Sequence, residues 1–105
     1  MFAKVFPILR LPRRFHVFDY AIPDGTSVSI GDVIQIPFRH RTVLGVVKSI
    51  ASSTSEKRVL DIVSGSIGFT IPEIDLERIE TIASELGQSV SSILNVAYEG
   101  LSAWR

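Results

Sequence analysis

Cysteine is absent from this 105-residue sequence, which excludes disulfide bridges and thiolate metal ligands. Histidine is scarce, because His16 and His40 are the only two, and two imidazoles alone rarely complete a metal site. No apolar run approaches the ~20 residues that a membrane-spanning helix needs. Near the start, Pro7 and Arg10 interrupt the apolar residues, so no targeting peptide is recognised. We therefore expect a cytoplasmic protein with neither a metal site nor a membrane partner.

Motifs for catalysis are missing as well. The sequence has no glycine-rich phosphate loop, no defensible Ser-His-Asp order and no paired carboxylates in a recognisable frame. No motif gives a place to ATP. We therefore expect a segment that is not an enzyme and that holds no cofactor.

Charge is balanced overall but not along the chain. The formal net charge is zero, yet residues 1–58 carry nine Lys/Arg against four Asp/Glu. Residues 59–105 carry two Lys/Arg against seven Asp/Glu. Such asymmetry indicates two surfaces with different partners, and the basic half suits phosphate. In the alternative interpretation, the two halves attract each other and complete one fold.

The first part of the chain predicts β-strands. Runs rich in Val, Ile and aromatic residues alternate there with turn residues, and the whole composition, with 46% hydrophobic and 21% charged residues, is that of a globular protein. The expected strands are residues 3–9, 15–22, 32–38, 43–50 and 59–63, with a polar loop at 51–57. Short strands at this spacing favour a small barrel or sandwich over a βαβ fold.

The last part predicts two helices. Thr70 offers an N-cap, with Pro72 and Glu73 in the first turn. Gly87 is a natural stop, and Ser89 can cap the second helix. Apolar residues recur at helical spacing: Leu76, Ile79, Ala83 and Leu86, then Val90, Ile93, Leu94, Ala97, Tyr98 and Leu101. The expected fold class is mainly β with α, with a β-barrel-like unit over residues 1–66 followed by a two-helix hairpin over residues 67–105.

Residues 82–93 also fit the pattern of a helix-turn-helix, with a small residue, a turn glycine and suitably placed apolar positions. The second helix of such a motif would expose Gln88, Ser89, Ser91, Ser92, Asn95 and Glu99. None of these is basic, whereas helices that dock in a DNA groove usually bring Lys or Arg to the phosphates. A packed helical hairpin is therefore the preferred interpretation, and a fragment of a transcription regulator is the alternative.

Two basic clusters stand at the ends of expected strands. Arg10, Arg13 and Arg14 lie between the first two strands, and Arg39, His40 and Arg41 fill the next hairpin. Neighbouring loops of a small barrel often project from one end, so the clusters are placed to converge on a phosphate backbone. Guanidinium groups bind phosphate bidentately, which suits arginine to that role. A solvated hairpin tip is the alternative.

The Phe18-Asp19-Tyr20 segment falls within an expected strand. Alternation places Phe18 and Tyr20 on one face and Asp19 on the other. On these grounds Phe18 and Tyr20 are core residues and Asp19 is a surface or turn residue. A bulge near the strand end would instead bring the ring and the carboxylate to one ligand, where the ring stacks on a base.

Several short motifs occur in a fixed order: Leu11-Pro12, Phe18-Asp19-Tyr20, Ile22-Pro23, Gly31, Val33-x-x-Ile36-Pro37-Phe38 and Gly45-Val46-Val47. Together they resemble the start of the primosomal protein N′ (PriA) family of bacterial replication-restart helicases. The resemblance implies that the chain is part of a longer ATP-dependent 3′–5′ DNA helicase, whose ATP and zinc sites lie elsewhere. It also implies that this part captures the 3′-terminal nucleotide of a nascent leading strand at a stalled fork.

The family pocket uses a Phe-Asp pair, which matches Phe18 and Asp19. It also uses the backbone after Pro-Phe, where many relatives have glycine and this chain has Arg39, and a lysine that aligns roughly to Lys57 or Arg58. The candidate DNA-binding residues are therefore Phe18, Asp19, Tyr20, Arg13, Arg14, Arg39, Arg41, Lys57 and Arg58. The implied partners are forked or single-stranded DNA with a free 3′-hydroxyl, single-strand-binding protein and other primosome proteins. A pure protein-interaction module is a third alternative.

Overall fold

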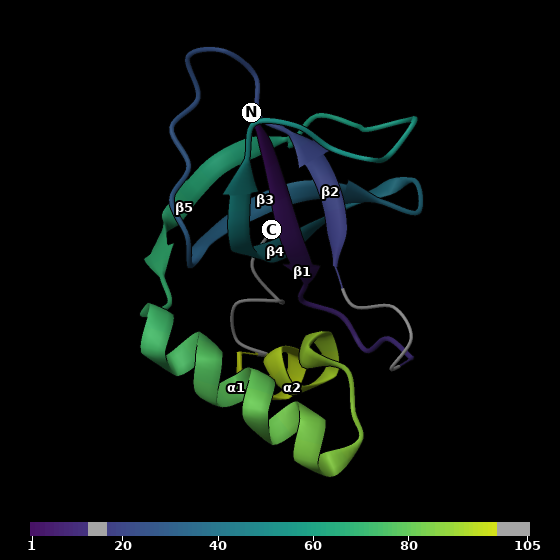
Figure 1. Ribbon diagram of the computed structural model, residues 1–105, viewed down its shortest axis with the longest axis vertical. Helices are drawn as coiled ribbons and strands as arrows, with labels where there is room; N and C mark the ends of the chain where they lie inside the picture. Colours follow the sequence, from purple (N-terminus) through teal and green to yellow (C-terminus); the bar gives the residue numbers. More distant parts are fainter. Residues whose placement is uncertain (13–16, 99–105) are drawn as a thin grey trace.

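The computed structural model describes residues 1–12 and 17–98. Five strands come first and two helices follow (Figure 1): β1 (Phe2–Pro7), β2 (Phe18–Ala21), β3 (Asp32–Phe38), β4 (Arg41–Ala51), β5 (Ser64–Thr70), α1 (Glu73–Leu86) and α2 (Val90–Ala97). The strands pair antiparallel in the order β2-β1-β4-β3-β5. This arrangement confirms a mainly β fold followed by a helical hairpin. The sheet is not closed, however, because β2 and β5 are its two edges, so barrel-like was too loose a description.

Both faces of the sheet carry buried apolar side chains. On one face Ile34 and Ile36 are fully buried with Val47, and Tyr20 and Ile62 reach the same cluster. On the other face a second set of side chains packs against the helices, which lie below the sheet in Figure 1: Phe6, Val33, Leu44 and Val46 from the strands with Leu76, Ala83, Val90 and Leu94 from the helices. The predicted division at residue 66 falls inside β5, and the helices share this core with β1 and β4.

The fifth strand is shifted from its predicted position. The sequence favoured residues 59–63, but β5 runs from Ser64 to Thr70, and the earlier run makes only one isolated bridge, from Asp61 to Ala21. Residues 64–70 contain two glycines and two serines, which have low strand propensity. These residues form a strand because they pair with β3, and the local sequence pattern does not indicate that pairing.

The start of α1 also differs from the prediction. Thr70 is the last residue of β5, and its hydroxyl donates to the Asp32 carboxylate at 2.7 Å instead of capping the helix. Pro72 occupies the N-cap position without a side-chain hydrogen bond. Glu73 and Asp75 lie in the first turn, where a carboxylate interacts favourably with the helix dipole.

The glycine turn between the helices is confirmed. Gly87 takes φ 66°, and the Gln88 amide donates to the Ala83 carbonyl at 2.9 Å, as in a Schellman motif. Ser89 caps α2 by accepting from the Ser92 amide at 3.0 Å. Leu94 is fully buried as predicted, but Leu86 and Ala97, which were also expected on the apolar stripes, are exposed.

The helix-turn-helix interpretation of residues 82–93 expected the polar residues at the start of α2 to be exposed, and for two of them this is wrong. Ser89 and Ser91 are buried, and both Ser89 and Ser92 hydroxyls lie within hydrogen-bonding distance of the Leu11 carbonyl, at 2.8 and 3.0 Å. This face of α2 therefore packs against the chain that leaves β1 and is closed to a DNA groove. Glu99 and Leu101 lie outside the described residues. None of the helices in the described part of the chain is long and apolar enough to cross a membrane.

Candidate nucleic-acid interface

The turn that joins β3 to β4 has an unusual backbone. Phe38 pairs with Arg41, so only Arg39 and His40 form the loop, with φ 50° and 65°. Positive φ at both central residues is typical of a type I′ turn, which usually contains Asn-Gly. Left-handed backbone in a residue other than glycine costs about 1–3 kcal/mol and is concentrated at functional sites. Arg39 therefore keeps the backbone conformation that glycine would favour.

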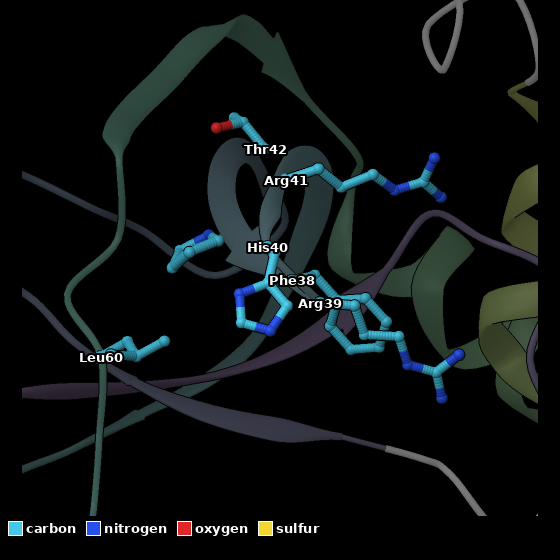
Figure 2. Close-up of a pocket in the computed structure, with 7 residues that line it drawn as sticks. Phe38, Arg39, His40, Arg41, Thr42 and Leu60 are labelled. Carbon is cyan, nitrogen blue, oxygen red and sulfur yellow. The ribbon is translucent and has the colours of Figure 1, made fainter.

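A hollow of about 490 Å³ lies beside this turn (Figure 2). Its lining consists of Pro37, Phe38, Arg39, His40, Arg41, Thr42 and Leu60. The arginine side chains extend away from the turn in Figure 2, whereas Leu60 belongs to the connection between β4 and β5. The volume falls within the range of about 300–1,000 Å³ that is usual for small-ligand sites. The hollow thus combines apolar walls with cations at its rim.

Two aromatic rings and a guanidinium lie in succession next to the hollow. The Phe18 and Phe38 rings meet edge to face, with centroids 5.1 Å apart. The Arg39 guanidinium carbon lies 5.1 Å from the centroid of Phe38, in cation–π contact. The edge strand β2 is thereby connected to the base of the hairpin turn. Phe18 is half-buried and packs beside the core, as the alternation predicted.

Tyr20 is a core residue and not part of an open DNA-binding surface. Its side chain is buried, and its hydroxyl donates to the Pro37 carbonyl at 2.8 Å. Burial raises the pKa of Tyr20 to about 12. Pro37 lies on β3, so this hydrogen bond joins β2 to the strand that leads into the hairpin. Pro37 also lines the hollow.

Asp19 points to the opposite face of β2 from Phe18 and is neither exposed nor in a turn. Only 8% of its side-chain surface is accessible. One carboxylate oxygen accepts from the Lys4 ammonium at 3.1 Å, and the other accepts from the Thr54 hydroxyl. The Thr54 hydrogen bond and then the Lys4 ammonium hold the pKa of Asp19 below its usual value, against the opposing effect of burial. Lys4 and Thr54 were not predicted from the sequence.

The remaining basic candidates divide into two groups. Lys57 and Arg58 are exposed in the β4–β5 connection, which lies on the same side of the molecule as the β3–β4 hairpin (Figure 1). This connection is held to β2, because the Ala21 amide donates to the Leu60 carbonyl at 2.9 Å. Arg13 and Arg14 lie outside the described residues, as does His16. Of the candidate residues, Arg39 and Arg41 line the hollow, and Phe18 contacts its lining only through Phe38. Lys57 and Arg58 lie two and three residues before Leu60, which also lines the hollow.

Ion pairs between the two oppositely charged halves are few among the residues that the structure describes. Among the described residues, Lys48 and Glu80 form the one pair between halves, at 3.4 Å, and both side chains are at least one-third exposed. Such surface pairs contribute only about 0–1 kcal/mol.

A basic hairpin beside a partly exposed aromatic ring is the combination expected of a nucleic-acid-binding domain. Comparison with known sequences identifies the family of this domain. Over residues 8–98 the chain matches, and belongs to, the PriA family described as the 3′ DNA-binding domain (3′BD). It is therefore a DNA-binding module.

One relative is the replication restart protein PriA of Rickettsia conorii (strain ATCC VR-613 / Malish 7). It is 29% identical over 92 residues, which cover 87% of this chain and 13% of the relative. The chain thus spans about one-eighth of the length of that relative.

Proposed function

We propose that this domain binds the 3′ end of a DNA strand and serves as the DNA-recognition part of a longer replication-restart protein. The observation that carries the proposal is the hollow at the β3–β4 turn, where Pro37 and Leu60 form apolar walls and Arg39 and Arg41 form a cationic rim. Membership of the 3′ DNA-binding domain family supports the same conclusion. The nascent leading strand at a stalled fork is the substrate that fits this role. ATP, zinc and helicase activity are assigned to other parts of the longer protein.

The chemistry of a nucleotide matches this arrangement. A base is a flat apolar group that packs against aliphatic walls or stacks on a ring such as Phe18. Its phosphates carry negative charge that guanidinium groups bind in a fork geometry. A nucleotide at a strand end enters a hollow more easily than an internal one, because the backbone must leave it in only one direction.

Asp19 lies outside the lining of the hollow and on the opposite face of β2 from Phe18, and it is the acceptor that we propose for the 3′-hydroxyl. A carboxylate has about four lone-pair positions, of which Lys4 and Thr54 use two, so an acceptor remains for a further hydroxyl proton. A 3′-hydroxyl donates such a proton, whereas a 2′,3′-dideoxy end has none to donate. Hydrogen bonds to charged groups contribute about 1.5–3 kcal/mol, which corresponds to roughly ten- to a hundredfold in affinity.

The experiment compares a circular single strand with a linear strand of the same length and sequence. Phosphate contacts are equal in the two, so tighter binding of the linear strand measures recognition of an end. A dideoxy 3′ end should remove much of that advantage, and a blocked 5′ end should leave it intact. Equal affinity for the circular and linear strands would show that the domain binds DNA without recognising an end.

A further inference from the structure

Thr54 lies in the connection between β4 and β5 and links two parts of the proposed site. Its hydroxyl donates to the Asp19 carboxylate on β2 and accepts from the Glu56 amide at 3.1 Å. Because the backbone amide can only donate, the hydroxyl proton is directed to Asp19. A single side chain thus closes a local turn and joins that turn to the edge strand.

The segment around Thr54 has little other support. Residues 52–58 form no regular structure, and all of them except Thr54 are exposed. Within the described residues, the hydrogen bonds of this segment are the two that involve the Thr54 hydroxyl. Lys57 and Arg58 follow directly, and Leu60 then lines the hollow beside the hairpin. Without the bond to Asp19, the backbone that carries these two cations would have no tertiary hydrogen bond before Leu60.

We propose that Thr54 is a positioning residue for DNA binding, which holds Lys57 and Arg58 where they meet the phosphates of the bound strand. The proposal rests on the proposed function, because it assumes that this segment faces the DNA. It gives Asp19 a second role, as the fixed anchor of the loop, in addition to its role as an acceptor. Thr54 itself need not touch DNA.

The size of the effect follows from the salt dependence of phosphate contacts. Each contact to a single strand contributes about −0.7 to the slope of log K against log[salt]. Over the tenfold interval from 1 M to 0.1 M salt, one contact therefore amounts to about fivefold in affinity, and two contacts to about 25-fold. Thr54→Val removes the hydroxyl but keeps the shape of the side chain, so it should weaken binding by roughly five- to 25-fold at 0.1 M salt.

The test uses the circular single strand, on which end recognition plays no part. Affinities at several salt concentrations are measured for wild type, Thr54→Val, Thr54→Ser and the control Ser53→Ala, an exposed hydroxyl of the same segment. The double variant Lys57→Ala, Arg58→Ala and the triple variant with Thr54→Val complete a thermodynamic cycle. Circular dichroism and thermal unfolding verify the fold, and Thr54→Ala replaces the valine variant if that variant melts below the assay temperature.

The expected result has three parts. Thr54→Val weakens binding and makes the salt slope less steep, Thr54→Ser and Ser53→Ala bind as wild type, and Thr54→Val has no further effect once Lys57 and Arg58 are alanine. A merely structural role would lower stability without changing the salt slope. Unchanged binding by Thr54→Val, or an undiminished loss in the background without the two cations, would overturn the proposal.

Failure of this inference can be told apart from failure of the proposed function. The advantage of a linear over a circular strand, measured on the wild-type protein, reports end recognition. If wild type shows no such advantage, end recognition is wrong. The measurements on the circle alone still decide whether Thr54 positions the cations.

Discussion

The rings of Phe18 and Phe38 meet edge to face at 81°, with centroids 5.1 Å apart. Phe38 is almost fully buried, whereas Phe18 lies on the edge strand and is only half-buried. Phe38 also contacts the Arg39 guanidinium, whose carbon lies 5.1 Å from the ring centroid. The accessible ring at the hairpin is therefore that of Phe18, and its position is fixed by a contact with the residue that precedes the turn.

Phe18→Ala should weaken binding of single-stranded DNA by about five- to 150-fold, because stacking on a base contributes roughly 1–3 kcal/mol. Phe18→Leu keeps an apolar side chain beside the core but removes the ring, so it should show most of the same loss. Phe69→Ala is the matched control, since Phe69 is a partly exposed aromatic residue on β5 whose ring contacts Tyr98. Full affinity in Phe18→Leu would exclude stacking on this ring.

Arg39 and Arg41 should bind phosphates at the rim of the hollow. Replacing both by Glu should lower affinity and make the salt slope less steep by about 0.7 for each phosphate that is no longer bound. Arg78→Glu on α1 is the control, because it changes the same charge on an exposed helix position away from the hairpin. Titrations at several salt concentrations with one oligonucleotide measure this. An unchanged slope in the Arg39, Arg41 variant would contradict the assignment.

Most of the fold could be predicted from the sequence, because it is determined by apolar alternation and turn residues. The resemblance motifs are largely positions of close packing. A Cβ atom on Gly45 would lie 2.5 Å from a methyl carbon of Val5, and Gly31 takes φ 88° where the chain passes the Ile71 carbonyl. The fifth strand could not be predicted, because its glycines and serines become a strand only by pairing with β3.

The site was predictable in part. The Arg39–Arg41 turn followed from two strong strand signals with basic residues between them, whereas the role proposed for Phe18 rests on the family resemblance. The partners of Asp19 could not be predicted. Pairing of β1 with β2 brings Lys4 to Asp19, and the irregular β4–β5 connection brings Thr54. Such contacts between distant parts of the chain leave no local pattern in a single sequence.

The left-handed turn predicts the effect of glycine at position 40. His40→Gly should relieve backbone strain and stabilise the fold by about 1 kcal/mol, part of the gain being offset by the greater freedom of glycine in the unfolded chain. For a domain of this size that corresponds to a rise in Tm of roughly 4–8 °C. His40→Val should lower Tm, because a β-branched residue tolerates positive φ poorly. Thermal unfolding by circular dichroism measures both, and a lower Tm for His40→Gly than for wild type would refute the strain.

The ion pair between Asp19 and the half-exposed Lys4 predicts how stability depends on pH. Hydrogen bonding from Thr54 and the charge of Lys4 hold the pKa of Asp19 below its ordinary value of 3.8. The folded protein therefore binds this proton less readily than the unfolded chain does. The resulting stabilisation is fully present above the ordinary pKa and is lost as pH falls through the lower folded value.

Urea unfolding of wild type and Asp19→Asn should consequently show a constant stability difference near neutral pH that shrinks below about pH 4. Asp24→Asn, at an exposed position in the β2–β3 connection, is the control for removal of a carboxylate, and it should track wild type far more closely. Thr54→Val removes the largest cause of the lowered pKa, so the pH dependence should be weaker in that background. NMR titration of the Asp19 carboxyl carbon should show the same change directly, as a pKa that rises toward 3.8 in Thr54→Val. A stability difference that stays constant throughout acid titration would mean that the Asp19 carboxylate gains nothing from Lys4 and Thr54, and Thr54 would then have no anchor on β2.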